Sequence, residues 1–337
     1  MTRQTSINQF SYMRIIACAA IILLHSLFAS FVYYEDAMTA GQLKGEILTE
    51  HMLMWAVPLF LMITGALLLD TDRKVTFEKL FKKYIKRIAV ALISFTLIFQ
   101  ILDYIAGDTE NIIGGWISNL ISGHSWAHVW YLYLMLGLYL MLPVYKKVID
   151  GSSKKLQQYI ILLLLLFTSV LPMIKNAGYA IGFDIPTVAV YPVYLFLGYY
   201  LYNNKMKRST AVMLMTGSSI VIIITALLQN NADESLAMKL AGFSKYYSIF
   251  VIGQTAGIFS LFNTIRLKAS NLINSIDKCT FGIYLIHMIG IRLVFKWMGI
   301  NPYSYGPVFF ICFVVVLFIS CYAITALIRK IPRLNLL

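Results

Sequence analysis

Charge is scarce in this sequence. Only 13% of the 337 residues are Asp, Glu, Lys or Arg, and 59% are hydrophobic. A soluble globular domain carries about a quarter charged residues and under half apolar ones. A water-soluble chain of this size cannot bury so much apolar surface in one core without leaving large exposed patches, and so apolar a chain is not disordered. The composition therefore predicts an integral membrane protein.

Several sequence features of other protein classes are also missing. There is no glycine-rich phosphate loop, no low-complexity segment and no evident internal repeat, and no polar segment is longer than about twenty residues. We therefore expect one membrane domain over residues 1–337. The four cysteines lack the spacing of a metal site, and we expect them to be small apolar packing residues: Cys18, Cys279, Cys312 and Cys321.

What the sequence does have is a series of long apolar stretches. A helix that crosses the hydrocarbon core needs about 20 mainly apolar residues. Ten stretches approach or exceed that length, which predicts an all-α integral membrane fold, a polytopic bundle of about ten transmembrane helices. They are 10–32, 50–69, 87–106, 127–146, 157–175, 187–202, 210–229, 243–263, 279–298 and 306–328. The apolar piece 112–121 is too short to cross and should lie at the membrane surface or enter it partway.

The formal net charge of +13 follows the same topology. With the N-terminus placed inside, 21 of the 28 Lys and Arg residues fall in inside segments and 5 in outside loops. This is the distribution that the positive-inside rule requires, so both termini are predicted to be cytoplasmic. The excess charge is then explained by topology and contacts with membrane lipids, and nucleic acid is not an expected partner.

Few ionisable residues lie within the apolar stretches, where they are costly and usually functional. They are Arg14, His25, Asp103, His287 and Arg292. Arg14 and His25 are eleven residues apart, which on a helix returns to within about 20° of the same face after a rise of about 16 Å. One face would thus carry a cation near the inner surface and an imidazole near the midplane. Alternatively, Arg14 extends to the inner phosphates and His25 bonds a neighbouring helix.

Four segments of the chain together resemble one family. Arg14–His25 resembles the Arg-x10-His signature of the acyltransferase 3 family, the integral-membrane O-acetylases of surface glycans. Three further segments resemble that family's motifs in the expected order: Pro58–Leu69 with its Thr-Gly pair, His128–Pro143 with its Trp-Tyr-Leu start, and Thr280–His287 with its Tyr-Leu-x-His end. The resemblance covers nearly the whole chain and points to no particular substrate.

The chain departs from the family at one basic motif. The family commonly has an Arg-x-x-Arg element just after the second span, and here Tyr84 stands in the place of the first arginine while Arg87 fits the second. Lys83 or Lys86 would supply the charge there, although a lysine lacks the bidentate fork of arginine.

The resemblance implies an activity and its co-substrate. An acyl-CoA such as acetyl-CoA would approach from the cytoplasm, bound by Arg14, Lys83, Lys86 and Arg87, with no metal involved. His25, together with Arg14, would be catalytic: an imidazole accepts a hydroxyl proton near neutral pH, or is itself transiently acylated. The acceptor would be a lipid-linked or cell-surface glycan, and the membrane a bacterial plasma membrane. Succinyl is as compatible with this reading as acetyl.

Four further residues are candidates for substrate contact, namely Trp130, Tyr131, Tyr284 and His287. Trp130 and Tyr131 would form a platform for a sugar ring, or else belong to the interfacial aromatic belt. His287 would contact substrate or serve as a packing histidine. His51, His124 and His128 are expected at the outer edge without the spacing of a zinc site. Asp103, Asp36 and Glu35 are weak candidates for a carboxylate that orients His25.

Two other functions remain open. A secondary transporter or exporter of glycan or of a small polar substrate also suits many spans and a midplane histidine. Transporters often show paired repeats with broken helices at matching positions, and this sequence shows no such symmetry. A regulatory subunit with an inactive site is the third possibility, which the Tyr84 departure keeps open.

Overall fold

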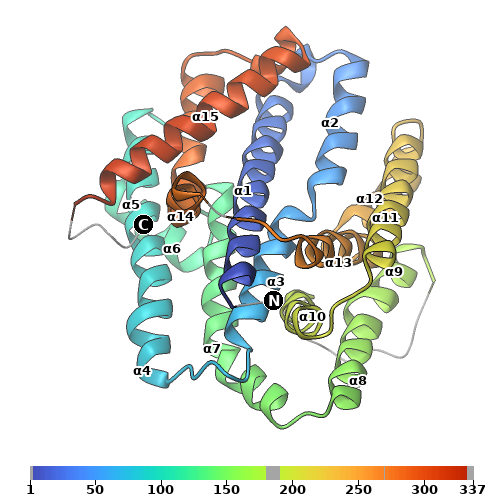
Figure 1. Ribbon diagram of the computed structural model, residues 1–337. Coiled ribbons are helices and arrows are strands. Elements are labelled where there is room, and N and C mark those ends of the chain that lie inside the picture. Colours follow the sequence, from blue (N-terminus) through green and yellow to red (C-terminus); the bar gives the residue numbers. More distant parts are fainter. Residues whose placement is uncertain (1–2, 180–189, 269, 332–337) are drawn as a thin grey trace.

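The structure is a computed structural model that describes residues 3–179, 190–268 and 270–331, without the side chains of residues 3–7. Every regular element in these ranges is helical and none is a strand, which confirms the predicted all-α class (Figure 1). Residues 187–189 of one expected span and Arg333 of the expected inner face lie outside the described residues.

Within the described residues, eight helical stretches are long and apolar enough to cross a membrane. Two are single helices: α11 (Arg208–Gln229) and α15 (Pro307–Ile328). The other six combine neighbouring elements, which are α1 (Arg3–Tyr34) with η1 (Glu35–Ala37), α2 (Ala40–Leu53) with α3 (Ala56–Leu68), α4 (Phe77–Lys79) with η2 (Leu80–Ile85) and α5 (Lys86–Ile105), η3 (Ala127–Val129) with α7 (Trp130–Asp150), α8 (Lys154–Leu165) with η4 (Leu166–Val170) and α9 (Leu171–Asn176), and α14 (Asn271–Arg292) with η6 (Leu293–Trp297).

The two other expected spans form shorter helices. α10 (Tyr191–Asn203) has 13 residues and α13 (Ile249–Thr264) has 16. Most of their residues are buried. In the view of Figure 1 they are inclined to α1, α5 and α8, which run from top to bottom. The apolar piece 112–121 forms α6 (Ile112–Ser122), which is too short to span the membrane, as predicted.

Glycines bring these shorter helices against their neighbours. A Cβ atom on Gly65 of α3 would lie 2.0 Å from the backbone oxygen of Leu195 in α10, and one on Gly198 would lie 2.0 Å from that of Met62. A Cβ on Gly257 of α13 would lie 2.7 Å from the backbone nitrogen of Met215 in α11. Close backbone approach at small residues is the usual way for helices to associate in a membrane. α3, α10, α11 and α13 therefore form a tightly packed support beside α1.

α1 and α14 position most of the chemistry. Ser11 Oγ donates to Asp277 Oδ2 at 2.8 Å, the Cys18 thiol donates to the carbonyl oxygen of Thr280 at 3.7 Å, and His25 pairs with His287. Residue numbers rise together along both helices, so α1 and α14 are parallel, as the predicted topology requires of its first and ninth spans. Three of the four cysteines are buried as expected, whereas Cys312 is exposed on α15.

Candidate active site

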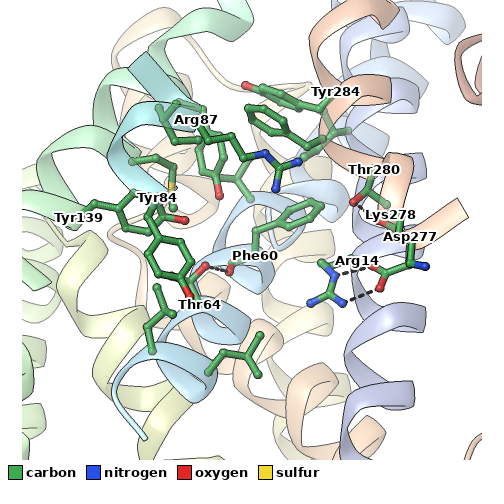
Figure 2. A pocket seen from close by; sticks show the side chains of 18 of the residues that line it. Arg14, Phe60, Thr64, Tyr84, Arg87, Tyr139, Asp277, Lys278, Thr280 and Tyr284 are labelled. Atoms are coloured by element: carbon green, nitrogen blue, oxygen red, sulfur yellow. Dashed lines mark hydrogen bonds and ion pairs between the residues drawn. The ribbon is translucent and has the colours of Figure 1, made fainter. Parts of the chain in front are cut away.

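A cavity of about 440 Å³ lies among α1, α3, α5, α7 and α14. Figure 2 shows Arg14 and Asp277 on one side of it, facing Tyr84 and Tyr139 on the other. Its walls are mainly apolar and aromatic, with charged groups at the end formed by the predicted inner segments. The charged lining residues are Arg14, Arg73, Arg87, Lys278 and Arg329, together with the single carboxylate of Asp277.

Arg14 is held by a carboxylate on the neighbouring helix. Its Nε and one terminal nitrogen donate to the two carboxylate oxygens of Asp277 at 2.5 and 2.7 Å. A bidentate pair of this kind fixes the direction of the guanidinium, so Arg14 lines the cavity and does not extend to the lipid phosphates. Sequence reasoning missed Asp277, because it lies just before an expected span. The sequence feature that could have indicated Asp277 is an acidic side chain beside Lys278, in a segment that was considered only for its basic residues.

The departure from the basic motif is compensated in space. Arg73 donates to the hydroxyl oxygen of Tyr84 at 2.8 Å and to the backbone oxygen of Leu67 at 3.1 Å. The charge that Tyr84 lacks is thus supplied at the same wall by Arg73, eleven residues earlier. The π-helical segment η2 carries Tyr84 into the cavity, and such segments are frequent at functional sites.

The other basic candidates lie in two different places. Arg87 lines the cavity, with its guanidinium carbon 4.6 Å from the ring centre of Phe281. Lys83 and Lys86 are exposed and are not among the lining residues. Of the four residues expected to bind the donor, Arg14 and Arg87 therefore share a cavity, together with Arg73, Lys278 and Arg329, which the sequence did not single out.

Three histidines meet beyond the end of the cavity that lies away from the predicted inner segments. The rings of His25 and His287 are nearly parallel, at an interplanar angle of 10° with their centres 5.0 Å apart, and they meet edge to edge, with His25 Nδ1 2.7 Å from His287 Nε2. The ring of His128 lies 5.2 Å from that of His287 and 6.4 Å from that of His25. His128 and His287 are completely buried, whereas His25 is partly exposed. The expectation that His128 is an outer-edge residue is therefore wrong, because the turn before α7 folds inward.

The hydrogen bonds determine which nitrogen of His25 carries a proton. His287 Nδ1 lies 2.6 Å from the carbonyl oxygen of Tyr284, which can only accept, so this nitrogen is protonated. In a neutral buried ring, His287 Nε2 is then an acceptor, and His25 Nδ1 must donate to it. The remaining nitrogen of His25, Nε2, carries a lone pair. His25 is therefore oriented as a general base, with His287 in the place that a carboxylate often takes.

Two aromatic residues connect the cavity with the histidines. Tyr131 and Tyr284 line the cavity, and their ring centres are 5.5 Å apart. Tyr284 also lies 5.7 Å from His287, and its hydroxyl donates to the backbone oxygen of His128. Trp130 faces elsewhere and packs against Tyr191 and Tyr246, with both centres 5.9 Å away. The candidate carboxylate Asp103 pairs with Arg292 and does not reach His25.

Comparison with known proteins identifies the family. The acyltransferase domain model matches residues 7–326. The chain belongs to the acyltransferase 3 family. The protein is thus a multi-pass membrane protein of a family of acyltransferases.

The curated relatives of this acyltransferase 3 protein have a more specific name. It is 24% identical over 311 residues to the "Probable poly-beta-1,6-N-acetyl-D-glucosamine export protein" of Staphylococcus aureus strain MRSA252, an alignment that covers 86% of this chain and 83% of that protein. The protein of the same name in strain Mu50 is 24% identical over 310 residues, with the same coverage. No solved structure matches the chain.

Proposed function

We propose that this protein is a membrane O-acyltransferase of a bacterial plasma membrane, which moves an acyl group from cytoplasmic acyl-CoA to a glycan hydroxyl. The observation that carries the proposal is the arrangement of these groups. A cavity with five cationic side chains is also lined by Tyr131 and Tyr284, and Tyr284 lies against His287, the partner of a histidine oriented as a base.

The cavity suits an acyl-CoA donor. Arginine forks match the geometry of phosphate oxygens, and Arg14, Arg73 and Arg87 lie around one opening. Because five basic side chains face a single carboxylate there, the opening attracts a polyanion. The apolar and aromatic walls then receive the pantetheine arm, with the thioester directed at Tyr131 and Tyr284.

The chemistry follows from the lone pair on His25 Nε2. This nitrogen takes the proton of the acceptor hydroxyl while the hydroxyl oxygen attacks the thioester carbonyl. The carbon–sulfur bond breaks, and the imidazolium returns the proton to the departing CoA thiolate. His287 stabilises the imidazolium through the hydrogen bond to Nδ1. The alternative is attack by His25 itself to form an acyl-histidine, which the acceptor oxygen then resolves.

For the acceptor we propose a cell-surface or lipid-linked polysaccharide built from N-acetylhexosamine units. The support is the printed name of the relatives, which refers to poly-beta-1,6-N-acetyl-D-glucosamine. Acetyl and succinyl donors fit the site equally, because the cationic opening recognises the CoA moiety that they share.

Export of the polysaccharide is the second candidate function. It is favoured by the same relatives, whose name describes an export protein. Transport of a polysaccharide does not require a histidine oriented as a base through Nε2, nor a cation-lined opening on the side of the basic segments. The two functions differ in their requirement for a thioester donor.

The deciding experiment uses the full chain purified into nanodiscs. We expect radiolabel from acetyl-CoA or succinyl-CoA to be transferred to the oligosaccharide acceptor by the wild-type protein. The His25→Ala variant should transfer none while it retains acyl-CoA binding and its melting temperature. Transfer by this variant at the wild-type rate would remove His25 from catalysis. Flux of labelled oligosaccharide into proteoliposomes without any thioester would favour the exporter.

A further inference from the structure

A second cavity, of about 470 Å³, lies at the opposite end of the molecule from the basic opening. It is formed by the last turns of α5, the loop that follows, α6, and the junction of α14 with η6. Apart from Gly115, every residue that lines it has a polar side chain. A polar cavity over the outer ends of membrane helices is not needed for packing, and its side chains offer hydrogen-bonding groups to a ligand.

The charges of this outer cavity cancel within it. Arg292 pairs with Asp103, and Lys296 pairs with Asp108. Each ion pair joins α14 or η6 to α5 or its following loop, so the four charged groups are held in place. A cavity with balanced, internally paired charges offers no net attraction to an anion or a cation. It suits a neutral ligand with many hydroxyl groups.

α6 presents different faces to the lipid and to this cavity. Ile113, Ile117 and Ile121 are spaced four residues apart and are 59%, 46% and 81% exposed, so they form one lipid-facing stripe. The other face carries Gly115 and Asn119. A Cβ on Gly115 would lie 2.2 Å from Gln100 Nε2, so this glycine lets α6 lie directly over the polar end of α5. An amphipathic helix of this kind lies in the membrane interface.

The amide of Asn119 is only partly used by the protein. Its Nδ2 donates to Gln100 Oε1 at 2.8 Å, while Gln100 Nε2 donates to Thr109 Oγ1 and to the backbone oxygen of Asn111, both at 3.1 Å. Within the part of the chain that the structure describes, neither the Oδ1 atom of Asn119 nor the hydroxyl of Ser118 has a partner. These groups supply both donors and acceptors, which sugar hydroxyls require.

A stack of side chains joins the outer cavity to the histidines. The guanidinium carbon of Arg292 lies 4.2 Å from the ring centre of Trp126. Trp126 is stacked on Phe99 at 4.3 Å, and Phe99 lies 5.2 Å from His128. His128 Nδ1 is buried and has no hydrogen-bond partner among the described residues. The stack therefore ends at an unsatisfied acceptor beside His25, on the face opposite the donor cavity.

We propose that the outer cavity is the acceptor subsite and that it binds a neutral carbohydrate. Asn119 and Ser118 bond its hydroxyl groups, and the Trp126–Phe99 stack separates the subsite from the three histidines, so these two side chains must move apart for one sugar hydroxyl to reach His25. This inference rests on the proposed acyl transfer, and it adds the place and the chemical class of the acceptor. Donor and acceptor then occupy separate cavities on opposite sides of the three histidines.

The test measures acceptor binding and acyl transfer separately. The probe is a short neutral N-acetylhexosamine oligosaccharide, titrated calorimetrically into the full chain in nanodiscs. We expect Ser118→Ala/Asn119→Ala to raise both its dissociation constant and the acceptor KM about tenfold, since about two hydrogen bonds are lost. The acyl-CoA dissociation constant should stay unchanged, which also shows that the variant is folded. Ile117→Ala, on the lipid face of the same helix, is the matched control and should leave all three constants unchanged.

The outcomes separate this inference from the proposed function. An acceptor KM and dissociation constant within twofold of wild type in the double variant overturn the outer subsite while acyl transfer stands. If the wild-type protein binds the oligosaccharide but transfers no acyl group, and the double variant loses that binding, the carbohydrate subsite is supported and the proposed acyltransferase activity is refuted. A wild-type protein that neither binds the oligosaccharide nor transfers to it overturns the inference.

Discussion

The role of His287 can be separated from that of His25 at the level of single atoms. His287 accepts from His25 Nδ1 through Nε2 and donates to Tyr284 through Nδ1. His287→Ala leaves His25 without this acceptor, so His25 loses its preferred tautomer and the imidazolium loses a partner. We expect kcat to fall about ten-thousandfold, as when the orienting residue of a catalytic histidine is replaced. The acyl-CoA dissociation constant should stay at the wild-type value.

A conservative variant makes this prediction specific. The carbonyl oxygen of His287→Gln can accept from His25 Nδ1, so this variant should recover part of the lost kcat without any change in donor binding. Equal kcat values for the alanine and glutamine variants would show that His287 acts by packing alone. Unchanged kcat in both would remove it from the mechanism.

Arg14 supports a second prediction at the residue scale. Its guanidinium engages both oxygens of Asp277 through two nitrogens, which leaves the third nitrogen for a donor phosphate. A lysine has a single ammonium group and cannot serve both partners with this geometry. Arg14→Lys should therefore raise the acyl-CoA dissociation constant about tenfold, as measured by calorimetry. Lys83→Ala, at an exposed position outside the cavity, is the control and should leave the constant unchanged.

Part of this site could be predicted from the sequence alone. What lies within one helix was predictable, whereas contacts that depend on how helices pack against each other were not. Helical periodicity places Arg14 and His25 on one face, because that depends only on the register within α1. The pairing of Arg14 with Asp277 and of His25 with His287 depends on how α1 packs on α14, which periodicity does not determine. His128 was missed because its inward position depends on the turn η3. Arg73 was missed because it meets Tyr84 only through the fold of the basic segment.

At the element scale, the supporting helices depend on glycines whose importance the sequence does not show. Gly65 and Gly198 lie where α3 and α10 cross, with a backbone oxygen of the other helix 2.0 Å from the Cβ position of each. Gly198→Ala must push the helices apart, because the contact is with backbone that cannot rotate away. Overpacking of this kind typically costs about 1–3 kcal/mol. We expect a melting temperature several degrees lower in detergent, measured by intrinsic fluorescence.

The chain offers a matched control for that substitution. Gly217 lies on α11 with no atom within 4 Å of its Cβ position. Gly217→Ala should leave the melting temperature unchanged or raise it, since alanine has the higher helix propensity. Equal effects of the two substitutions would mean that the α3–α10 crossing is looser than the structure has it.

On the scale of the whole molecule, the two cavities require a definite orientation in the membrane. The donor cavity opens among Arg73, Lys278 and Arg329, all in segments that the positive-inside rule places in the cytoplasm, where acyl-CoA is made. The outer cavity lies at the other ends of α5 and α14. In Figure 1 the turn between α7 and α8 lies at the lower end of the molecule and α2 at the upper end. The direction of acyl transfer, from the cytoplasm outward, therefore depends on the prediction that both termini are cytoplasmic.

Cysteine labelling in intact cells tests that orientation. In a background where the four native cysteines are replaced by alanine, Lys155→Cys at the start of α8 should react with a membrane-impermeant maleimide only after the cells are permeabilised. Glu234→Cys at the start of α12 should react in intact cells. The reason is the distribution of basic residues, 21 in inside segments and 5 in outside loops. The reverse labelling pattern would place the basic opening outside, where acyl-CoA is absent, and would contradict the donor site together with the topology.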